Sequence, residues 1–400
     1  MALPTGAIYF DHAATTPVDH RVVERMLPYM TELFGNPSSI YGLGRASLEA
    51  VDEAHETIAR ALGRRPTEIV FTGGGSEADN LAIKGTMRAK RRHGNHLITS
   101  AIEHHAVLRT CQRLEQEGYV VTYLPVDRYG RVDPHAVADA IIDETALVTI
   151  MLANNEVGTI QPIAEISRIC RERRIPLHTD AVQAGGSLDL RPIAAQVDML
   201  SLSAHKFYGP KGVGALFVRQ GIRLQPQIAG GSQERNRRAG TENVPGAVGA
   251  AHALSLAEET REAETARLII LRERLIAGVL AIPGVQLTGH PTERLPNSAS
   301  FLIDGVEGES LLLNLDLVGI CASSGSACTT GDIEPSHVLT AMGYSAAASR
   351  GALRLTLGHS NDDADVDFLL ERLPAIVARL RGMSTRPAEA RATAPISAHD

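Results

Sequence analysis

The sequence predicts an α/β fold, in which a mostly parallel seven-stranded sheet is covered by helices and is followed by a smaller α+β domain. From Glu68 onward, short apolar segments alternate with amphipathic ones, which is typical of parallel βαβ units. After residue 281 this alternation changes, which indicates a second core. A chain of 400 residues is long enough for one large and one small domain.

The strands expected in the large sheet are short, apolar and followed by polar residues. They are 68–72, 96–100, 120–126, 146–153, 176–180 and 199–203, and a seventh strand at 214–218 is expected to close the sheet. Segment 162–174 is amphipathic with a helical period and is therefore expected to cover one face.

A long Ala-, Leu- and Glu-rich helix at 246–281 is expected to leave the large domain. It is followed by strands near 285–289, 298–303, 320–324 and 352–358 and by helices near 308–316, 336–342 and 361–382. We therefore expect a large domain at 12–255 and a small domain formed by 1–11 and 256–383. The Pro- and Ala-rich residues 384–400 have no periodicity and are expected to be a disordered tail.

Composition excludes several classes of protein. Apolar residues make up 44%, charged residues 21%, and the formal net charge is −7 without a basic run, so neither nucleic acid nor a membrane is expected as a partner. No secretory signal and no membrane-spanning segment are apparent. The four cysteines include no C-x-x-C pair, which argues against a disulfide framework and an intrinsic metal site and favours the cytoplasm.

The segment "SAHKFYGPKG" (203–212) follows a buried strand, at a position where open α/β sheets bind ligands. A lysine there, Lys206, is a candidate for imine chemistry, because burial lowers an amine's pKa. Ser203 and His205 beside it could contact an anion. The alternative is a surface lysine in a polar turn.

Two further strand ends carry candidate groups. Asp180, in "HTDAVQ", could hold the ring nitrogen of pyridoxal phosphate protonated, with Gln183 near a ring substituent; the alternative is a helix cap. In "FTGGGSEADN", Gly75 and Ser76 open a helix and could form a phosphate cradle. This segment matches neither the ATP nor the dinucleotide glycine motif, and a simple N-capped turn is the alternative.

His104, in "IEHHAVL", could stack on a cofactor ring and exchange protons. A helix-start residue or a His-His metal pair with His105 are the alternatives. Arg354, in "ALRLTLG", could grip a substrate carboxylate with its guanidinium, or could be a solvated strand residue. Cys328, in "SGSACTTGD", lies in a Gly/Ser-rich loop, either as an incidental thiol or as one displayed for reaction.

The same motifs resemble those of a known family. Together with "YFDHAATTPVD", "FGNPSS", "NNEVGTIQPI" and "GGSQERNRRAGTEN", they make the chain similar to the pyridoxal-phosphate cysteine desulfurases of the NifS/IscS group, within the class V aminotransferase-like, fold type I enzymes. The resemblance covers residues 9 to about 382. The form of the last motifs and the short loop around Cys328 look closest to the nitrogen-fixation branch.

The resemblance implies a role for each matching residue. Lys206 would form the imine with the cofactor, Asp180 would pair with the ring nitrogen, Gln183 would contact the ring hydroxyl, and His104 would stack on the ring. The resemblance also implies phosphate contacts from Gly75, Ser76, Ser203, His205 and, in a homodimer, Thr241 of the neighbouring subunit. Asn155 and Arg354 would bind the substrate carboxylate, and Asn36 would line the entrance.

The chain departs from the family pattern at three positions. Ser76 stands where a Thr is usual, although the hydroxyl is kept. His12 occupies the second place of the N-terminal motif, where Asn or Tyr is common, and His359 stands where an Arg often follows the strand of Arg354. We expect the reaction to be unchanged, with His359 able to affect loop docking or pH response.

The implied activity is the removal of sulfur from L-cysteine, which gives L-alanine and a persulfide on Cys328 for an iron–sulfur scaffold or another acceptor. Cys328 would then be the residue that contacts a nascent cluster. Three alternatives stay open at this point: another fold type I lyase or transaminase, a selenocysteine lyase, and a sulfur-trafficking protein without cofactor. The other cysteines, Cys111, Cys170 and Cys321, are expected to be structural, with a relay from Cys328 to Cys321 as a further alternative.

Overall fold

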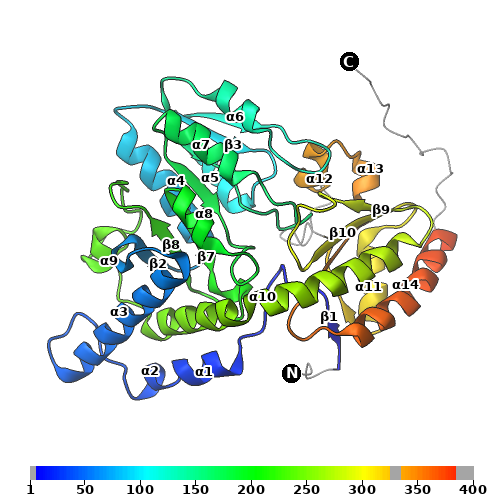
Figure 1. Ribbon diagram of the computed structural model, residues 1–400, viewed down its shortest axis with the longest axis horizontal. Coiled ribbons are helices and arrows are strands. Elements are labelled where there is room, and N and C mark those ends of the chain that lie inside the picture. The colour runs from blue at the N-terminus through cyan, green and yellow to red at the C-terminus, as the bar shows by residue number, and fades with distance from the viewer. Residues whose placement is uncertain (1–5, 325–334, 384–400) are drawn as a thin grey trace.

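The computed structural model describes residues 6–324 and 335–383. Figure 1 shows two parts, one around a large sheet and one around a small sheet, with the helix α10 (Val244–Leu280) running from one to the other. Cys328 and the tail 384–400 lie outside the described residues.

The large sheet has seven strands, as predicted, in the order β2-β8-β7-β6-β5-β3-β4. In chain order these are β2 (Ile69–Thr72), β3 (His96–Ser100), β4 (Val120–Leu124), β5 (Thr145–Thr149), β6 (Leu177–Asp180), β7 (Met199–Ser203) and β8 (Gly214–Val218). Strands β4, β3, β5, β6 and β7 are mutually parallel. Strand β8 was expected to close the sheet. It lies instead between β7 and β2 and runs antiparallel to both.

Alternating side chains of the strands build two cores, one on each face of the sheet. Leu97 packs with residues of α4 (Gly75–Lys90) and α5 (His105–Gln116). The next residue, Ile98, packs in the core on the opposite face. The helices that contribute to this second core are α3 (Gly42–Leu62), α6 (Pro134–Ala140), α7 (Ile163–Glu172), α8 (Leu190–Gln196) and the first half of α10.

The small sheet is antiparallel, with the order β12-β10-β9. Its strands are β9 (Val285–Thr288), β10 (Ser298–Ile303) and β12 (Ala352–Thr356). A separate core joins them to α11 (Gly308–Asp316), α14 (Asp363–Met383) and the second half of α10. We propose a domain boundary inside α10, because the two halves of this helix pack into different cores. The expected position, 255 and 256, precedes Ala257, which still packs in the large core, and the helix joins the small core from Leu268.

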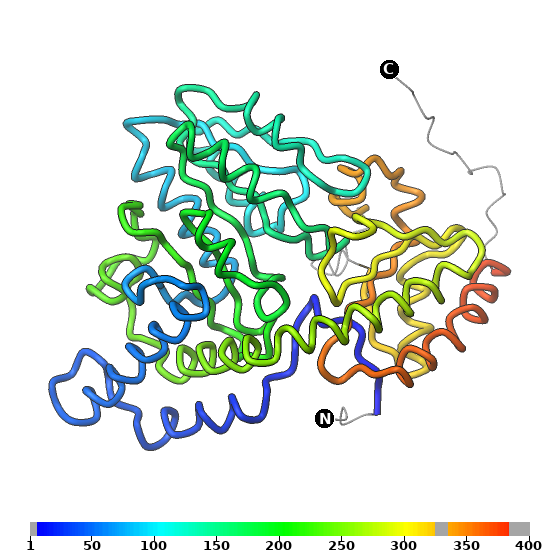
Figure 2. The backbone as a smooth tube through the Cα atoms, viewed as in Figure 1, coloured from blue at the N-terminus to red at the C-terminus, as the bar shows by residue number. Residues whose placement is uncertain are grey.

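The N-terminal segment crosses between the two parts. Strand β1 (Ile8–Tyr9) pairs in parallel with β11 (Ile320–Cys321) beside the small sheet. Figure 2 shows the chain then running to α1 (His20–Met26) and α2 (Pro28–Thr31), at the other part. The first residues therefore bind to elements more than 300 positions away.

Short helices connect the remaining elements. They are α9 (Gln233–Asn236), α12 (His337–Ala341), α13 (Ala346–Ser349) and the 3-10 turns Pro66–Glu68 and Ala204–Lys206. Within the two described stretches, no helix combines the length and the apolar character that crossing a bilayer requires.

Candidate active site

The predicted lysine lies at the carboxyl end of β7, in the turn Ala204–Lys206. Its Nζ donates to the backbone oxygens of Ala13, at 2.5 Å, and of Ala14, at 2.7 Å. Gln183 also donates to Ala13 O, at 3.1 Å, and His205 Nδ1 lies 3.1 Å from Thr15 Oγ1. The N-terminal segment therefore lines the site. The sequence motif at this segment did not indicate that position.

Asp180 ends the adjacent strand β6, and only 6% of it is exposed. Its Oδ1 accepts from the backbone N–H of Val182 at 2.9 Å. The alternative, a helix cap, is not what the structure shows, because a turn rather than a helix follows Asp180. Burial raises the pKa of Asp180 to about 6, against the lowering effects of the Val182 N–H and of nearby Lys206. A buried carboxylate next to an amine is suited to hold a second cation.

Gly75 begins α4, after Gly74 with φ +146°, a conformation that favours glycine. A side chain at Gly75 would lie 2.7 Å from Val182 Cγ2 and 3.4 Å from Ser203 Cβ. Backbone approach is thus close here, and Ser76 is exposed at the first turn while Ser203 is buried. The N-terminus of this helix, with two hydroxyls beside it, has the composition of an anion cradle.

His104 is the N-cap of α5, and its Nδ1 accepts from Ala106 N at 3.1 Å. Burial, and then Lys206, lower the pKa of His104 to about 4. The ring is therefore neutral near pH 7, and because Nδ1 is an acceptor, the proton is on Nε2. His104 is therefore a helix-start residue, which was one of the alternatives. This position does not exclude the predicted role at the cofactor ring.

Arg354 is not a solvated strand residue, since it is 3% exposed on β12. Its Nη2 forms an ion pair with Asp11 Oδ1 at 2.7 Å, and its Nη1 donates to Asn155 O at 2.9 Å. The structure therefore brings Arg354 to the backbone of Asn155 and adds Asp11. Asp11 precedes His12 in the N-terminal motif, but nothing in the local sequence indicated its partner.

Both flanks of the segment that holds Cys328 are attached to this site. On one side, Ser323 pairs with Arg354 through backbone hydrogen bonds. On the other side, Ser336 donates to Glu156 Oε2 at 2.5 Å, and His337 Nε2 lies 2.9 Å from Glu103 O, next to His104. The chain therefore leaves and re-enters the described structure beside the predicted substrate residues.

Asn36 and Thr241 are not brought to the site within one chain. Both are exposed, and Asn36 Oδ1 accepts from Ser38 N in its own turn. Thr241 follows a loop with three consecutive residues of positive φ, 234–236, that is attached by a buried His55–Glu234 contact of 3.0 Å. No contact among the described residues joins either side chain to Lys206.

The two histidines that depart from the family pattern both lie near one tyrosine, Tyr208. His359 stacks on Tyr208 with ring centroids 3.8 Å apart, and the His12 ring is 6.2 Å from Tyr208. Tyr208 comes two residues after Lys206. Burial, followed by His359, lowers the pKa of His12 to about 4.

The three described cysteines lack reactive surroundings. Cys111 and Cys170 are buried and Cys321 is partly buried, and burial raises the pKa of each thiol. A raised pKa lowers the thiolate fraction. No group of side chains in the described residues has the composition of a metal site.

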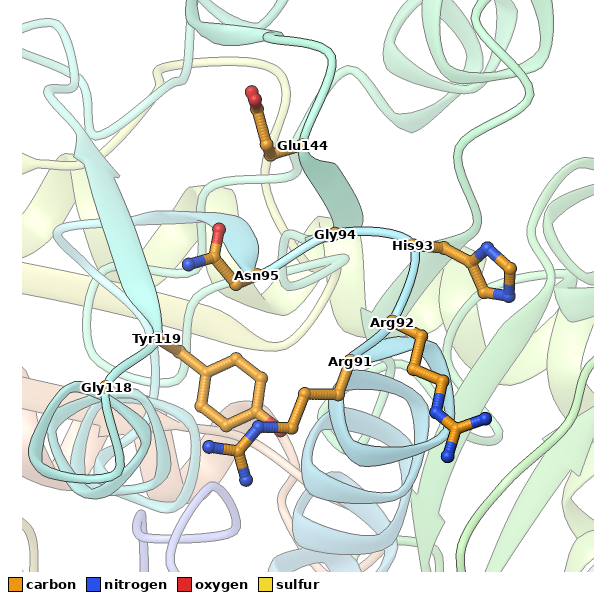
Figure 3. Close-up of a pocket in the computed structure, with 8 residues that line it drawn as sticks. All are labelled: Arg91, Arg92, His93, Gly94, Asn95, Gly118, Tyr119 and Glu144. Atoms are coloured by element: carbon orange, nitrogen blue, oxygen red, sulfur yellow. The ribbon is translucent and has the colours of Figure 1, made fainter.

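A separate pocket of about 420 Å³ lies at the other end of the large sheet. Figure 3 shows Arg91 over the ring of Tyr119 there, with a guanidinium-to-centroid distance of 5.6 Å. The pocket borders the start of β3, whereas Lys206 and Asp180 follow the opposite ends of their strands. It is therefore not part of the candidate active site.

The fold is that of the pyridoxal-phosphate enzymes of fold type I, and the residues at the strand ends fit that cofactor. The fit rests on the close backbone approach at Gly75, the buried carboxyl of Asp180, the amine of Lys206 and the neutral ring of His104.

The chain belongs to the class-V aminotransferase family, whose pattern matches residues 8–369. It is 55% identical over 378 residues to a cysteine desulfurase IscS of Methanosarcina thermophila, covering 94% of each chain. Over 376 residues it is 47% identical to a cysteine desulfurase IscS 1 of Archaeoglobus fulgidus, covering 94% of this chain and 98% of the relative. A solved NifS-like protein superposes with a TM-score of 0.88 at 37% identity, covering 93% of this chain and all of that one.

Proposed function

We propose that the protein is a cysteine desulfurase that uses pyridoxal phosphate, converts L-cysteine to L-alanine and carries the sulfur as a persulfide on Cys328. The observation that carries this proposal is the attachment of both flanks of the Cys328 segment to Arg354 and Glu156. This attachment holds the ends of the segment beside the residues that would bind the substrate. The family and the named relatives support the same activity.

The cofactor would be held by residues of the large sheet. Lys206 would bind it covalently, Asp180 would face the ring nitrogen, Gln183 the ring hydroxyl, and His104 the ring face. Gly75, Ser76, Ser203 and His205 would hold the phosphate. When bound, pyridoxal phosphate supplies an electron sink for the carbon atoms of the substrate.

The substrate carboxylate would bind between Arg354 and Asn155. The guanidinium already donates from both of its terminal nitrogens, to Asp11 and to Asn155 O, so its orientation is fixed. A fixed fork of this kind loses little freedom when it binds a carboxylate. The 3% exposure of Arg354 also strengthens the charge interaction by excluding water.

Two groups of this chain would move protons. Lys206 Nζ would take the proton from the substrate Cα, because it lies at the strand end next to Asp180. His104 carries its proton on Nε2 and accepts with Nδ1 from the helix backbone, so Nε2 would donate to the substrate and could take the thiol proton only after passing its own proton on. Its lowered pKa of about 4 means that the ring would release an added proton readily.

Cys328 would act as the nucleophile, as a thiolate. An S–S bond forms between Cys328 and the substrate sulfur while the C–S bond breaks. The carbon keeps the electron pair of that bond and takes up a proton, so that alanine is released. The persulfide then passes to a thiol of an acceptor protein, for which an iron–sulfur scaffold is the expected class.

A homodimer would complete the site. Apolar side chains are exposed on α1, α2 and the segment that leads into α3, including Met30, Phe34 at 67%, Ile40 at 91% and Tyr41. A patch of this kind favours association. Thr241 would then reach the phosphate in the partner's site, and Asn36 would line the entrance.

The direct test is incubation of the purified, cofactor-loaded protein with L-cysteine. The expected products are alanine and, with a thiol reductant, sulfide in equal amounts, without any keto acid. Transamination of alanine with a keto acid would instead favour another fold type I enzyme. Faster turnover of selenocysteine than of cysteine would favour a selenocysteine lyase, and a protein without visible absorbance would favour a carrier without cofactor.

The acceptor, the compartment and the branch are further parts of the proposal. We place the protein in the cytoplasm and in the supply of sulfur to iron–sulfur clusters, with the nitrogenase metallocluster as one destination. Pull-down with the persulfidated protein, followed by mass spectrometry of the captured thiol protein, identifies the acceptor. Recovery of a general scaffold alone would favour a housekeeping role over nitrogen fixation.

A further inference from the structure

Behind Asp180 the large domain holds a group of buried ionisable residues that the proposed mechanism does not use. They come from three parts of the chain: Asp79 from α4, His178 from β6 and Glu103 from the segment after β3. Each is at most 1% exposed. Buried groups that could carry charge must be paired, neutral or both.

The charge of Asp180 raises the pKa of Asp79. Asp79 Oδ1 is 3.7 Å from His178 Nε2, and the carboxyl interacts with the hydroxyl of Ser201. Ser201 is the residue opposite Asp180 in the β6–β7 register. His178 and Asp180 are two residues apart on one strand, so their side chains share a face.

The histidine in this group does not provide a positive charge. His178 Nδ1 lies 2.7 Å from Thr149 Oγ1, and its Nε2 lies 3.0 Å from Ser201 Oγ. The two hydroxyls satisfy both ring nitrogens in the neutral form. Complete burial lowers the pKa of His178 to about 3, so the imidazole stays neutral.

The charge balance then favours ionisation of one acid over the other two. Asp79, Asp180 and Glu103 are all buried, and among the described residues Lys206 is the cation that lowers the pKa of Asp180. Glu103 accepts from Ser100 and Met151, and burial raises its pKa to about 8. Burial and then the charge of Asp180 raise the pKa of Asp79 well above its ordinary value.

We propose that Asp79 is a positioning residue that stays protonated and supports Asp180, the carboxylate that faces the ring nitrogen of the cofactor. Asp79 lies 3.7 Å from His178, which shares a sheet face with Asp180, and its neutral carboxyl leaves the negative charge on Asp180. A second carboxylate there would compete for the same proton. This inference rests on the proposed function only for the identity of the cofactor that Asp180 faces.

The test compares Asp79→Asn, which keeps the shape and a donor without an acidic proton, with Asp79→Leu, which removes the polar group. We expect Asp79→Asn to keep the visible absorbance of the bound cofactor and kcat within about threefold. Asp79→Leu should lower kcat by about 100-fold with little change in KM, because the ring nitrogen loses its fixed partner. It should also shift the pH midpoint of the cofactor absorbance.

A direct readout is the infrared carbonyl stretch of a protonated carboxylic acid, recorded for the holoenzyme and for the cofactor-free protein. The wild-type band should lose one component in Asp79→Asn. The proposal is overturned if no component is lost, if Asp79→Asn is as impaired as Asp79→Leu, or if Asp79→Leu matches the wild type in kcat and absorbance. If Asp79→Leu does not fold, the infrared comparison decides alone. Because that band requires no turnover, absence of desulfurase activity would overturn the proposed function without affecting this result.

Discussion

The two ends of the candidate active site are built in different ways. The proposed cofactor end consists of neighbouring strands and the helix on them, with Asp180 at the end of β6 and Ser203 and Lys206 at the end of β7. The substrate end joins Asp11, Asn155 and Arg354, from distant parts of the chain. The positions of the side chains at the cofactor end are fixed by one sheet. The positions at the substrate end depend on how the small sheet packs against the large one.

The difference predicts which changes affect the cofactor and which affect the substrate. Loss of a group at the sheet end should alter the absorbance of the bound cofactor. Loss of a group at the assembled end should alter KM or sulfur transfer and leave that absorbance intact. Three changes examine this separation and a fourth examines the packing of the N-terminal segment, from the largest expected effect to the smallest.

Lys206→Ala should abolish desulfuration, with a loss of at least about 10⁴-fold, because it removes both the covalent attachment and the base. Borohydride reduction followed by mass spectrometry should find no cofactor attached to the protein. Lys90→Ala, at the far end of α4, is the control and should retain the attachment. Cofactor still tethered in Lys206→Ala would assign the chemistry to another lysine.

Cys328→Ala should lose sulfide release while keeping the cofactor absorbance, since the nucleophile and the cofactor are held by different parts of the chain. Sulfide and alanine assays, together with the visible spectrum, check this outcome. Cys321→Ala is the matched control and should release sulfide normally. Full activity in Cys328→Ala would remove this residue from the mechanism, and loss of release in Cys321→Ala would favour a relay.

Arg354→Lys should raise KM for L-cysteine by about 10- to 100-fold, because one ammonium cannot replace the two-pronged contact with a carboxylate. The cofactor absorbance should not change, and steady-state kinetics with a parallel spectrum measure both. The exposed Arg350 provides the control, Arg350→Lys, which should leave KM unchanged. An altered cofactor absorbance with an unchanged KM would instead assign Arg354 to the cofactor end of the site.

His12→Asn should reduce the acid sensitivity of the fold. A lowered pKa in the folded state means that stability is complete above the unfolded pKa of about 6.5 and is lost as pH falls toward 4. Between pH 6.5 and pH 5 the wild type should therefore lose about 2 kcal/mol that the variant keeps. Urea unfolding at the two pH values measures this difference.

The control for that measurement is His20→Asn, which changes an exposed histidine of α1. Its loss of stability on acidification should equal that of the wild type. An equal loss in His12→Asn would mean that His12 does not contribute to the pH dependence. The comparison uses the change between two pH values, so that any direct effect of the substitution on packing cancels.

Most of the large sheet could be predicted from the sequence. The expected strands 96–100, 199–203 and 214–218 have the observed bounds, because buried strands are continuous apolar segments with sharp polar ends. The helices before residue 66 were not predicted, although α3 has ten buried residues that recur with a helical period. The sequence indicated the strand β8 but not its place between β2 and β7. Strand order depends on contacts between segments, which no single segment contains.

The residues expected at the cofactor end lie at strand ends, as the apolar segments before them indicated. Their roles toward the cofactor stay predictions. Asp79, His178 and Glu103 were missed, since a buried acid in a helix or strand has no local signal of its partner. Cys328 and the tail 384–400 remain predictions, as both lie outside the described residues.

The sequence by itself determined the fold class, the family and the set of reactive groups, because apolar period and strand-end chemistry are local properties of a chain. Only the tertiary structure decided that Arg354 pairs with Asp11, 343 residues away. It likewise decided that His12 and His359 both lie near Tyr208. Such pairs arise where distant elements pack together, and neither residue type nor spacing specifies that packing.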